Sequence, residues 1–112
     1  MEIIVLGYEY CVNCPIAWEY AKRFAEEYGL KARYLEVFKD DYATRLYNEA
    51  VKHGYEGVPQ VYVVVNGVEY FIMLGVPDTY MEFKQAVLEM LEYYGLGICN
   101  EQTSISKTEQ GR

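Results

Sequence analysis

The chain has 112 residues, of which 52% are hydrophobic and 24% are charged, and its formal net charge at pH 7 is −7. Such a composition excludes a disordered chain and predicts one small soluble domain with a single core. The negative charge would repel phosphate backbones, so nucleic acid is not an expected partner.

No targeting segment is expected at the start of the chain. Residues 1–2 carry no positive charge, and the apolar run IIVLG is too short for a signal sequence or a membrane span. We therefore expect a cytoplasmic protein with no membrane partner. The three cysteines do not suit a framework of stapling disulfides, because their number is odd. In a reducing cytosol a close cysteine pair is more often catalytic or metal-binding than structural.

The first half of the chain predicts two strands and two helices. Residues 2–8, EIIVLGY, form an apolar run rich in β-branched residues, which predicts a buried strand. Residues 12–28 keep apolar side chains at helical spacing. Residues 31–38, KARYLEVF, alternate as a second strand would, and a second helix is expected over residues 40–54.

The second half predicts a hairpin and a last helix. An Asn-Gly dipeptide, the strongest two-residue hairpin signal, separates residues 60–65 from residues 68–74. Thr79 and Glu82 then stand at capping-box spacing before an amphipathic helix.

The predicted element order is β-α-β-α-β-β-α, an α/β fold whose four-stranded mixed sheet is flanked by helices on both faces. Residues 1–96 would form this domain, and residues 97–112 would form a polar C-terminal tail.

Cys11 and Cys14 are expected on the first turn of the first helix, at the carboxyl end of the first strand, where open α/β sheets place their sites. The helix N-terminus favours the thiolate, which is the reactive form of cysteine. Cys11 is nearer to the free amide groups and is the expected nucleophile. Cys14, deeper in the helix, is the expected resolving thiol. Pro15 suits a first helical turn.

Two other interpretations of the pair compete with redox chemistry. A zinc site needs four ligands, and the remaining candidates, His53 and Cys99, show no second paired spacing, so no metal is expected. A permanent structural disulfide across so short a loop would contribute little to stability. The spacing therefore favours a redox pair.

Three segments together resemble the thioredoxin/glutaredoxin superfamily over about residues 2–94. They are CVNCP after the first strand, GVPQVYVVVNGVEYFIMLG later in the chain, and the closing helix. Within the superfamily the chain is similar to small archaeal glutaredoxin-like proteins and to single units of protein disulfide oxidoreductases. The resemblance implies a thioredoxin-like fold and a thiol–disulfide oxidoreductase.

The resemblance also implies the course of the reaction and the partners. Cys11 would attack a disulfide of a partner protein, and Cys14 would then release the reduced partner. A reductase of the thioredoxin-reductase type, or glutathione, would supply electrons, and the chain would need no cofactor of its own.

By the same resemblance, four further residues would bind the substrate. Val58-Pro59 matches the place where the family has a cis proline, and the Val58 backbone would pair with the substrate chain. Gly75 matches a small residue that keeps the substrate groove open, although a plain strand-ending turn is an equal alternative. Tyr10 stands where thioredoxins have a tryptophan.

The chain also departs from the family. Val5 stands where thioredoxins keep a buried acid that moves the proton of the resolving thiol. Tyr8 and Glu9 stand where glutathione-binding glutaredoxins have a basic residue before the cysteines. The stretch LGVPD stands where they have Gly-Gly-x-Asp, and its Asp78 is expected to cap the last helix. These departures argue against glutathione binding.

Glu9 would oppose the Cys11 thiolate while the helix N-terminus favours it, and no Lys or Arg lies within ten residues before Cys11. We therefore expect a moderately lowered Cys11 pKa. The alternative function is a thioredoxin-fold binding module with a redox-sensitive cysteine pair and no turnover, which the thirteen tyrosines would suit.

Overall fold

The computed structural model describes residues 1–97; Cys99 and the expected polar tail, apart from its first residue, lie outside the described range. The order of the elements is the one predicted from the sequence. In chain order they are β1 (Glu2–Gly7), α1 (Cys14–Tyr28), β2 (Lys31–Glu36), α2 (Asp41–Lys52), β3 (Gln60–Val65), β4 (Val68–Leu74) and α3 (Tyr80–Tyr93).

The four strands form one mixed sheet in the order β2-β1-β3-β4. β1 runs parallel to β2, and β3 runs antiparallel to both β1 and β4. The predicted architecture is therefore confirmed. Of the described helices, none has the length and apolar character needed to cross a membrane.

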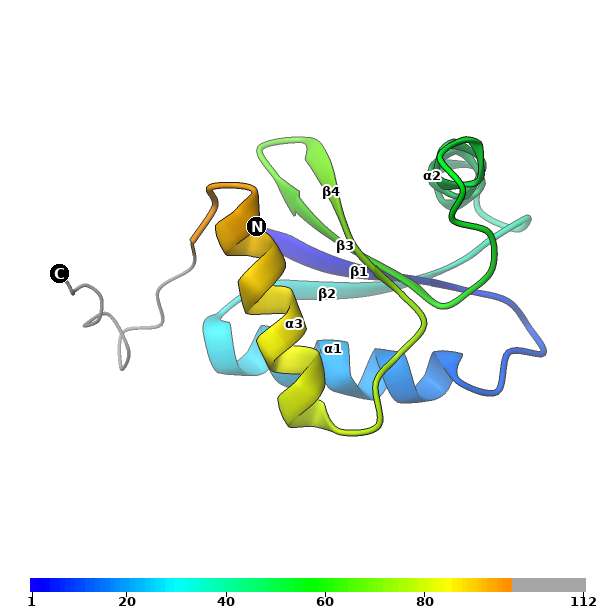
Figure 1. Cartoon of the computed structure of the whole chain (residues 1–112). Coiled ribbons are helices and arrows are strands. Elements are labelled where there is room, and N and C mark those ends of the chain that lie inside the picture. Colours follow the sequence, from blue (N-terminus) through cyan, green and yellow to red (C-terminus); the bar gives the residue numbers. More distant parts are fainter. Residues whose placement is uncertain (98–112) are drawn as a thin grey trace, which may run out of the picture.

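The helices cover both faces of the sheet, with α1 and α3 on one face and α2 on the other (Figure 1). In β1, Ile3 and Val5 pack toward α1 and α3, while Ile4 and Leu6 pack toward α2. All four side chains are fully buried. This two-sided burial explains why the sequence of β1 is a continuous apolar run rather than an alternating one.

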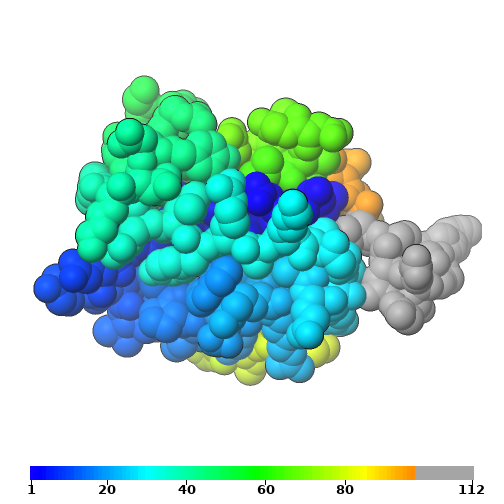
Figure 2. All heavy atoms as spheres, turned by 180° about the vertical axis from the view of Figure 1, so that it is seen from behind, coloured from blue at the N-terminus to red at the C-terminus, as the bar shows by residue number. Residues whose placement is uncertain are grey.

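The segment that joins β1 to α1 lies at one end of the molecule, beside α2 (Figures 1 and 2). Cys11 lies within this segment, after the end of β1, and Cys14 is the first residue of α1. The sheet thus presents the cysteine pair at the carboxyl end of β1, as in other open α/β sheets.

Two local expectations about helix starts were wrong. α1 begins at Cys14 with Asn13 as the N-cap, so Cys11 precedes the helix instead of lying on its first turn. A proline suits the first turn because no amide is needed there, and Pro15 holds the helix start at this point. Asp78 does not cap α3. Thr79 does, within a complete capping box that its spacing from Glu82 predicted.

Candidate active site

Cys11 and Cys14 form a disulfide, with their Cα atoms 5.4 Å apart. Cys14 is fully buried, whereas Cys11 is partly exposed. The Cys11 amide donates a hydrogen bond to the Tyr8 carbonyl at 3.4 Å, and the first turn of α1 contains no acidic residue. One sulfur therefore meets solvent and the other stands behind it, as an attacking and a resolving thiol would have to be arranged.

A pocket of about 800 Å³ opens beside Cys11. Two of the residues expected to bind substrate, Tyr10 and Val58, line it, and the Tyr10 side chain is 90% exposed. The complete lining is Tyr8, Glu9, Tyr10, Cys11, Glu36, Val37, Phe38, Lys39 and Val58. Val58, far from Cys11 and Tyr10 in the sequence, therefore shares one site with them.

The other two residues expected to bind substrate do not line this pocket. Pro59 is fully buried, and the Val58–Pro59 peptide bond is cis. The Gly75 amide donates a 2.7 Å hydrogen bond to the Pro59 carbonyl. Gly75 follows β4 directly with φ +86°, a conformation that suits a glycine-containing turn, and no atom of the described residues lies within 4 Å of the place a Cβ would take there.

An aromatic cluster, which the sequence did not reveal, forms one side of the pocket. The Phe38 ring stacks on Tyr8 at 5.7 Å and meets the edge of Tyr47 at 5.8 Å. Phe38 is 66% exposed and has φ +73°, a left-handed conformation that its amide stabilises by donating to Thr44 Oγ1 at 2.8 Å. Such a conformation is costly for a bulky residue and is often found at functional sites.

The charges around Cys11 also differ from the sequence expectation. Lys39 Nζ lies 3.8 Å from Glu9 and 3.6 Å from Glu36, and all three residues line the pocket. The sequence showed no basic residue shortly before Cys11, but the turn after β2 brings one to the pocket. Burial and a hydrogen bond with Tyr47 raise the pKa of Tyr8 to about 12, so the Tyr8 side chain is uncharged at neutral pH.

Cys14 is buried against a different set of side chains. A Cβ built on Gly7 would stand 3.0 Å from Cys14 Sγ and would overlap the Tyr34 hydroxyl. The centre of the Tyr34 ring lies 5.9 Å from that of Trp18, one helical turn after Cys14. Val5, at the place of the thioredoxin acid, is fully buried in the apolar core.

The fold matches that of a solved structure. Thioredoxin 1 from the thermophilic eubacterium Thermosipho africanus superposes with a TM-score of 0.54, covering 85% of this chain and 99% of that chain, at 16% sequence identity. The fold is thioredoxin-like. No protein-family model matches the sequence, and no curated protein matches it. At this identity the match establishes the fold alone, and the narrower resemblance to glutaredoxin-like proteins stays a prediction.

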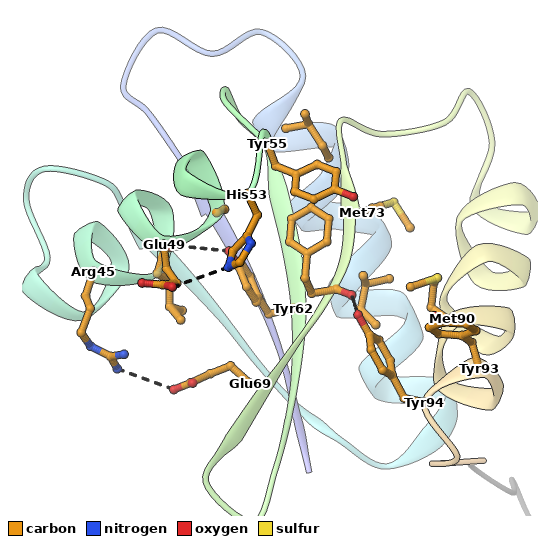
Figure 3. Close-up of a pocket in the computed structure, with 15 residues that line it drawn as sticks. Arg45, Glu49, His53, Tyr55, Tyr62, Glu69, Met73, Met90, Tyr93 and Tyr94 are labelled. Atoms are coloured by element: carbon orange, nitrogen blue, oxygen red, sulfur yellow. Dashed lines mark hydrogen bonds and ion pairs between the residues drawn. The ribbon is translucent and has the colours of Figure 1, made fainter.

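The thioredoxin-like fold contains a second, larger pocket of about 950 Å³, and no cysteine of residues 1–97 lines it. Figure 3 shows charged side chains on one side of this pocket and aromatic ones on the other. Arg45 pairs with Glu69 at 3.6 Å, and the Tyr94 hydroxyl donates to the Phe71 carbonyl at 2.7 Å. His53, one of the two zinc candidates, lies here beside Glu49 and not near the cysteine pair.

No metal-binding cluster is found in the described range, where no three His, Cys, Asp or Glu side chains are grouped to hold an ion. Cys99, the other zinc candidate, lies outside that range.

Proposed function

We propose that the protein is a thiol–disulfide oxidoreductase that exchanges disulfides with partner proteins. One observation carries the proposal: a disulfide-bonded pair joins a partly exposed Cys11, open to a pocket, to a fully buried Cys14. The thioredoxin-like fold, in which this pair follows the first strand, supports it.

The reaction would proceed in two exchanges. The Cys11 thiolate attacks one sulfur of the partner's disulfide, forms a mixed disulfide with it and expels the other sulfur as a thiolate. Cys14 loses its proton and attacks Cys11 Sγ. This step forms the Cys11–Cys14 disulfide and expels the partner's second thiolate, so that two electrons pass to the partner. A reductase of the thioredoxin-reductase type, or glutathione, would return the pair to the dithiol in a cytoplasmic setting.

The substrate chain would lie along Val58 and the exposed aromatic side chains. Within residues 1–97 neither the amide nor the carbonyl of Val58 has a hydrogen-bond partner, which leaves both free to pair with an extended peptide. Tyr10 and Phe38 offer large apolar surfaces on the same pocket. Gly75 would support this segment through its hydrogen bond to Pro59.

The test combines a redox titration with turnover. Alkylation and intact mass across a thiol/disulfide buffer series should show a reversible two-electron step between roughly −300 and −120 mV. With dithiothreitol as donor, the protein should reduce a fluorogenic peptide disulfide repeatedly. Cys11→Ser should abolish turnover, Cys14→Ser should trap the mixed disulfide, and Cys99→Ser should be active. A pair that never opens or closes across that range would refute the proposal.

The second pocket favours an alternative, in which the chain is a binding module whose affinity responds to the redox state of the pair. Its aromatic side is accessible, with Tyr93 80% exposed. Such a module would bind its partner differently in the oxidised and reduced states and would show no turnover. Repeated reduction of a substrate disulfide by the wild-type protein, lost in Cys11→Ser, would exclude it.

A further inference from the structure

The proposed exchange requires the buried Cys14 to lose a proton. Val5, the residue of the first strand at the place of the thioredoxin acid, has no group that could accept this proton. Burial disfavours a thiolate and raises the pKa of a thiol. Cys14 is fully buried, and Val5, which occupies the place of the thioredoxin acid, is apolar. The start of α1, where Cys14 lies, favours the thiolate, and a hydrogen-bond donor near the sulfur would stabilise it further.

The Tyr34 hydroxyl and the Cys14 sulfur both border the space that a side chain on Gly7 would fill. In the parallel register Tyr34 is opposite Val5, and both pack on the face of the sheet that α1 covers. A Cβ on Gly7 would overlap the Tyr34 hydroxyl, stand 2.7 Å from Tyr34 Cζ and stand 3.0 Å from Cys14 Sγ. The hydroxyl and the sulfur thus border the same methyl-sized space.

The Tyr34 hydroxyl is free to make a hydrogen bond. It has no partner among residues 1–97, unlike the hydroxyls of Tyr80 and Tyr94, which donate to Glu27 and to the Phe71 carbonyl. Burial, and more weakly Glu36, raise the pKa of Tyr34. The phenol therefore keeps its proton at neutral pH, where it can act as a hydrogen-bond donor but not as a base.

We propose that Tyr34 donates a hydrogen bond to the Cys14 thiolate as it forms. Tyr34 would thus assist Cys14 in a fold whose first strand has Val5 in place of the thioredoxin acid. The Cys14 proton passes to water, the thiolate accepts the Tyr34 hydrogen bond and then attacks Cys11 Sγ, and the partner's sulfur leaves as a thiolate. Hydrogen bonds to charged groups are worth more than neutral ones, so the donor favours the ionised sulfur. This step rests on the proposed oxidoreductase function.

The other ionisable groups nearby border Cys11 rather than the space beside Cys14. Those that line the Cys11 pocket are Tyr8, Glu9, Tyr10, Glu36 and Lys39. Among the contacts described for Gly7 and Trp18, the ionisable groups besides Cys14 are the Tyr34 phenol, at the space beside the sulfur, and Lys22, whose Nζ lies 5.4 Å from the centre of the Trp18 ring and pairs with Glu19 at 2.9 Å. Tyr34 is thus the group whose removal should change the titration of Cys14.

The test measures the titration of Cys14 alone. In a Cys11→Ser, Cys99→Ser background, the rate of iodoacetamide alkylation against pH gives the Cys14 pKa from its midpoint and the accessibility of the sulfur from its plateau. Tyr34→Phe should raise that pKa by about one unit, a tenfold loss of thiolate at neutral pH. Tyr94→Phe removes a hydroxyl that donates to the Phe71 carbonyl, and it should leave the Cys14 pKa unchanged.

A second arm separates this role from a general loss of structure. In a Cys14→Ser, Cys99→Ser background, Tyr34→Phe should leave the alkylation profile of Cys11 unchanged. An unchanged Cys14 midpoint in Tyr34→Phe, or an equal shift in Tyr94→Phe, would overturn the proposal. Neither arm needs a partner protein, so absence of turnover would refute the oxidoreductase function while these titrations still decide the role of Tyr34.

Discussion

Lys39 lies 3.8 Å from Glu9 across the mouth of the pocket that holds Cys11. The side chains are 61% and 59% exposed, so the pair is screened by solvent and contributes little to stability. Its consequence is local. Lys39 partly offsets the carboxylates of Glu9 and Glu36, which would otherwise disfavour the Cys11 thiolate.

Substitution of these two charges should move the reactivity of Cys11 in opposite directions. Lys39→Gln should raise the Cys11 pKa and Glu9→Gln should lower it, each by about half a unit or less at low ionic strength. The measurement is alkylation rate against pH in a Cys14→Ser, Cys99→Ser background. Both shifts should shrink in high salt. Shifts of the same sign would show that these charges do not act on Cys11.

Gly7→Ala should destabilise the protein, because the new methyl group would meet Tyr34 and Cys14 Sγ. Overpacking of this kind typically costs about 1–3 kcal/mol of unfolding free energy. Urea denaturation of the reduced protein measures the loss. In a Tyr34→Leu background the same substitution should cost less, since the hydroxyl that it overlaps is gone.

A matched control is Gly97→Ala, where a Cβ would contact no atom of residues 1–97 within 4 Å. Its unfolding free energy should stay within about 0.5 kcal/mol of the wild type. If Gly7→Ala costs as much in the Tyr34→Leu background as in the wild type, the methyl group and the Tyr34 side chain do not compete for this space.

Phe38→Ala should weaken exchange with protein substrates while sparing small ones. The exposed ring lines the Cys11 pocket, so its loss should lower kcat/KM for a protein disulfide by about five- to tenfold. The rate with hydroxyethyl disulfide, which is too small to reach the ring, should hold. Tyr93→Ala removes another exposed ring, from the second pocket, and should change neither rate. A loss for Tyr93→Ala alone would mean that the protein substrate contacts the second pocket and not the ring of Phe38.

Glu27 should contribute to stability at neutral pH and lose that contribution in acid. Lys84 at 2.6 Å and Tyr80 at 2.7 Å donate hydrogen bonds to its carboxylate, and these bonds lower its pKa below the ordinary value of 4.5. The folded state therefore favours the ionised form. Its stabilising effect is complete above the unfolded pKa and disappears as the pH falls through the folded one.

Lys84→Met should consequently reduce the unfolding free energy at pH 7 by roughly 0.5–1 kcal/mol, and by less at about pH 3. Urea titrations at the two pH values measure the difference. Lys22→Met, which removes a more exposed pair with Glu19, should show little effect at either pH. A loss as large in acid as at neutral pH would mean that the Lys84 side chain acts through packing.

The sequence by itself determined the elements and located the cysteine pair that forms the disulfide. The Asn-Gly turn, with φ +52° at Asn66 and +80° at Gly67, set the hairpin register, and the capping box set the start of α3. These signals act over a few residues, so they can be recognised without knowing the partners of a segment. The parallel β1–β2 pairing followed from the order of the elements.

The surroundings of the two sulfurs were decided by tertiary structure. Lys39 and Phe38 line the same pocket as Cys11 because β2 lies beside β1 and the chain turns after it. Tyr34 and Cys14 border the same small space because Gly7 has no side chain to fill it. The spacing of residues along the chain does not predict such contacts between separate elements. They depend on which face a strand turns inward, on the sizes of side chains on neighbouring elements, and on the space one residue leaves for another.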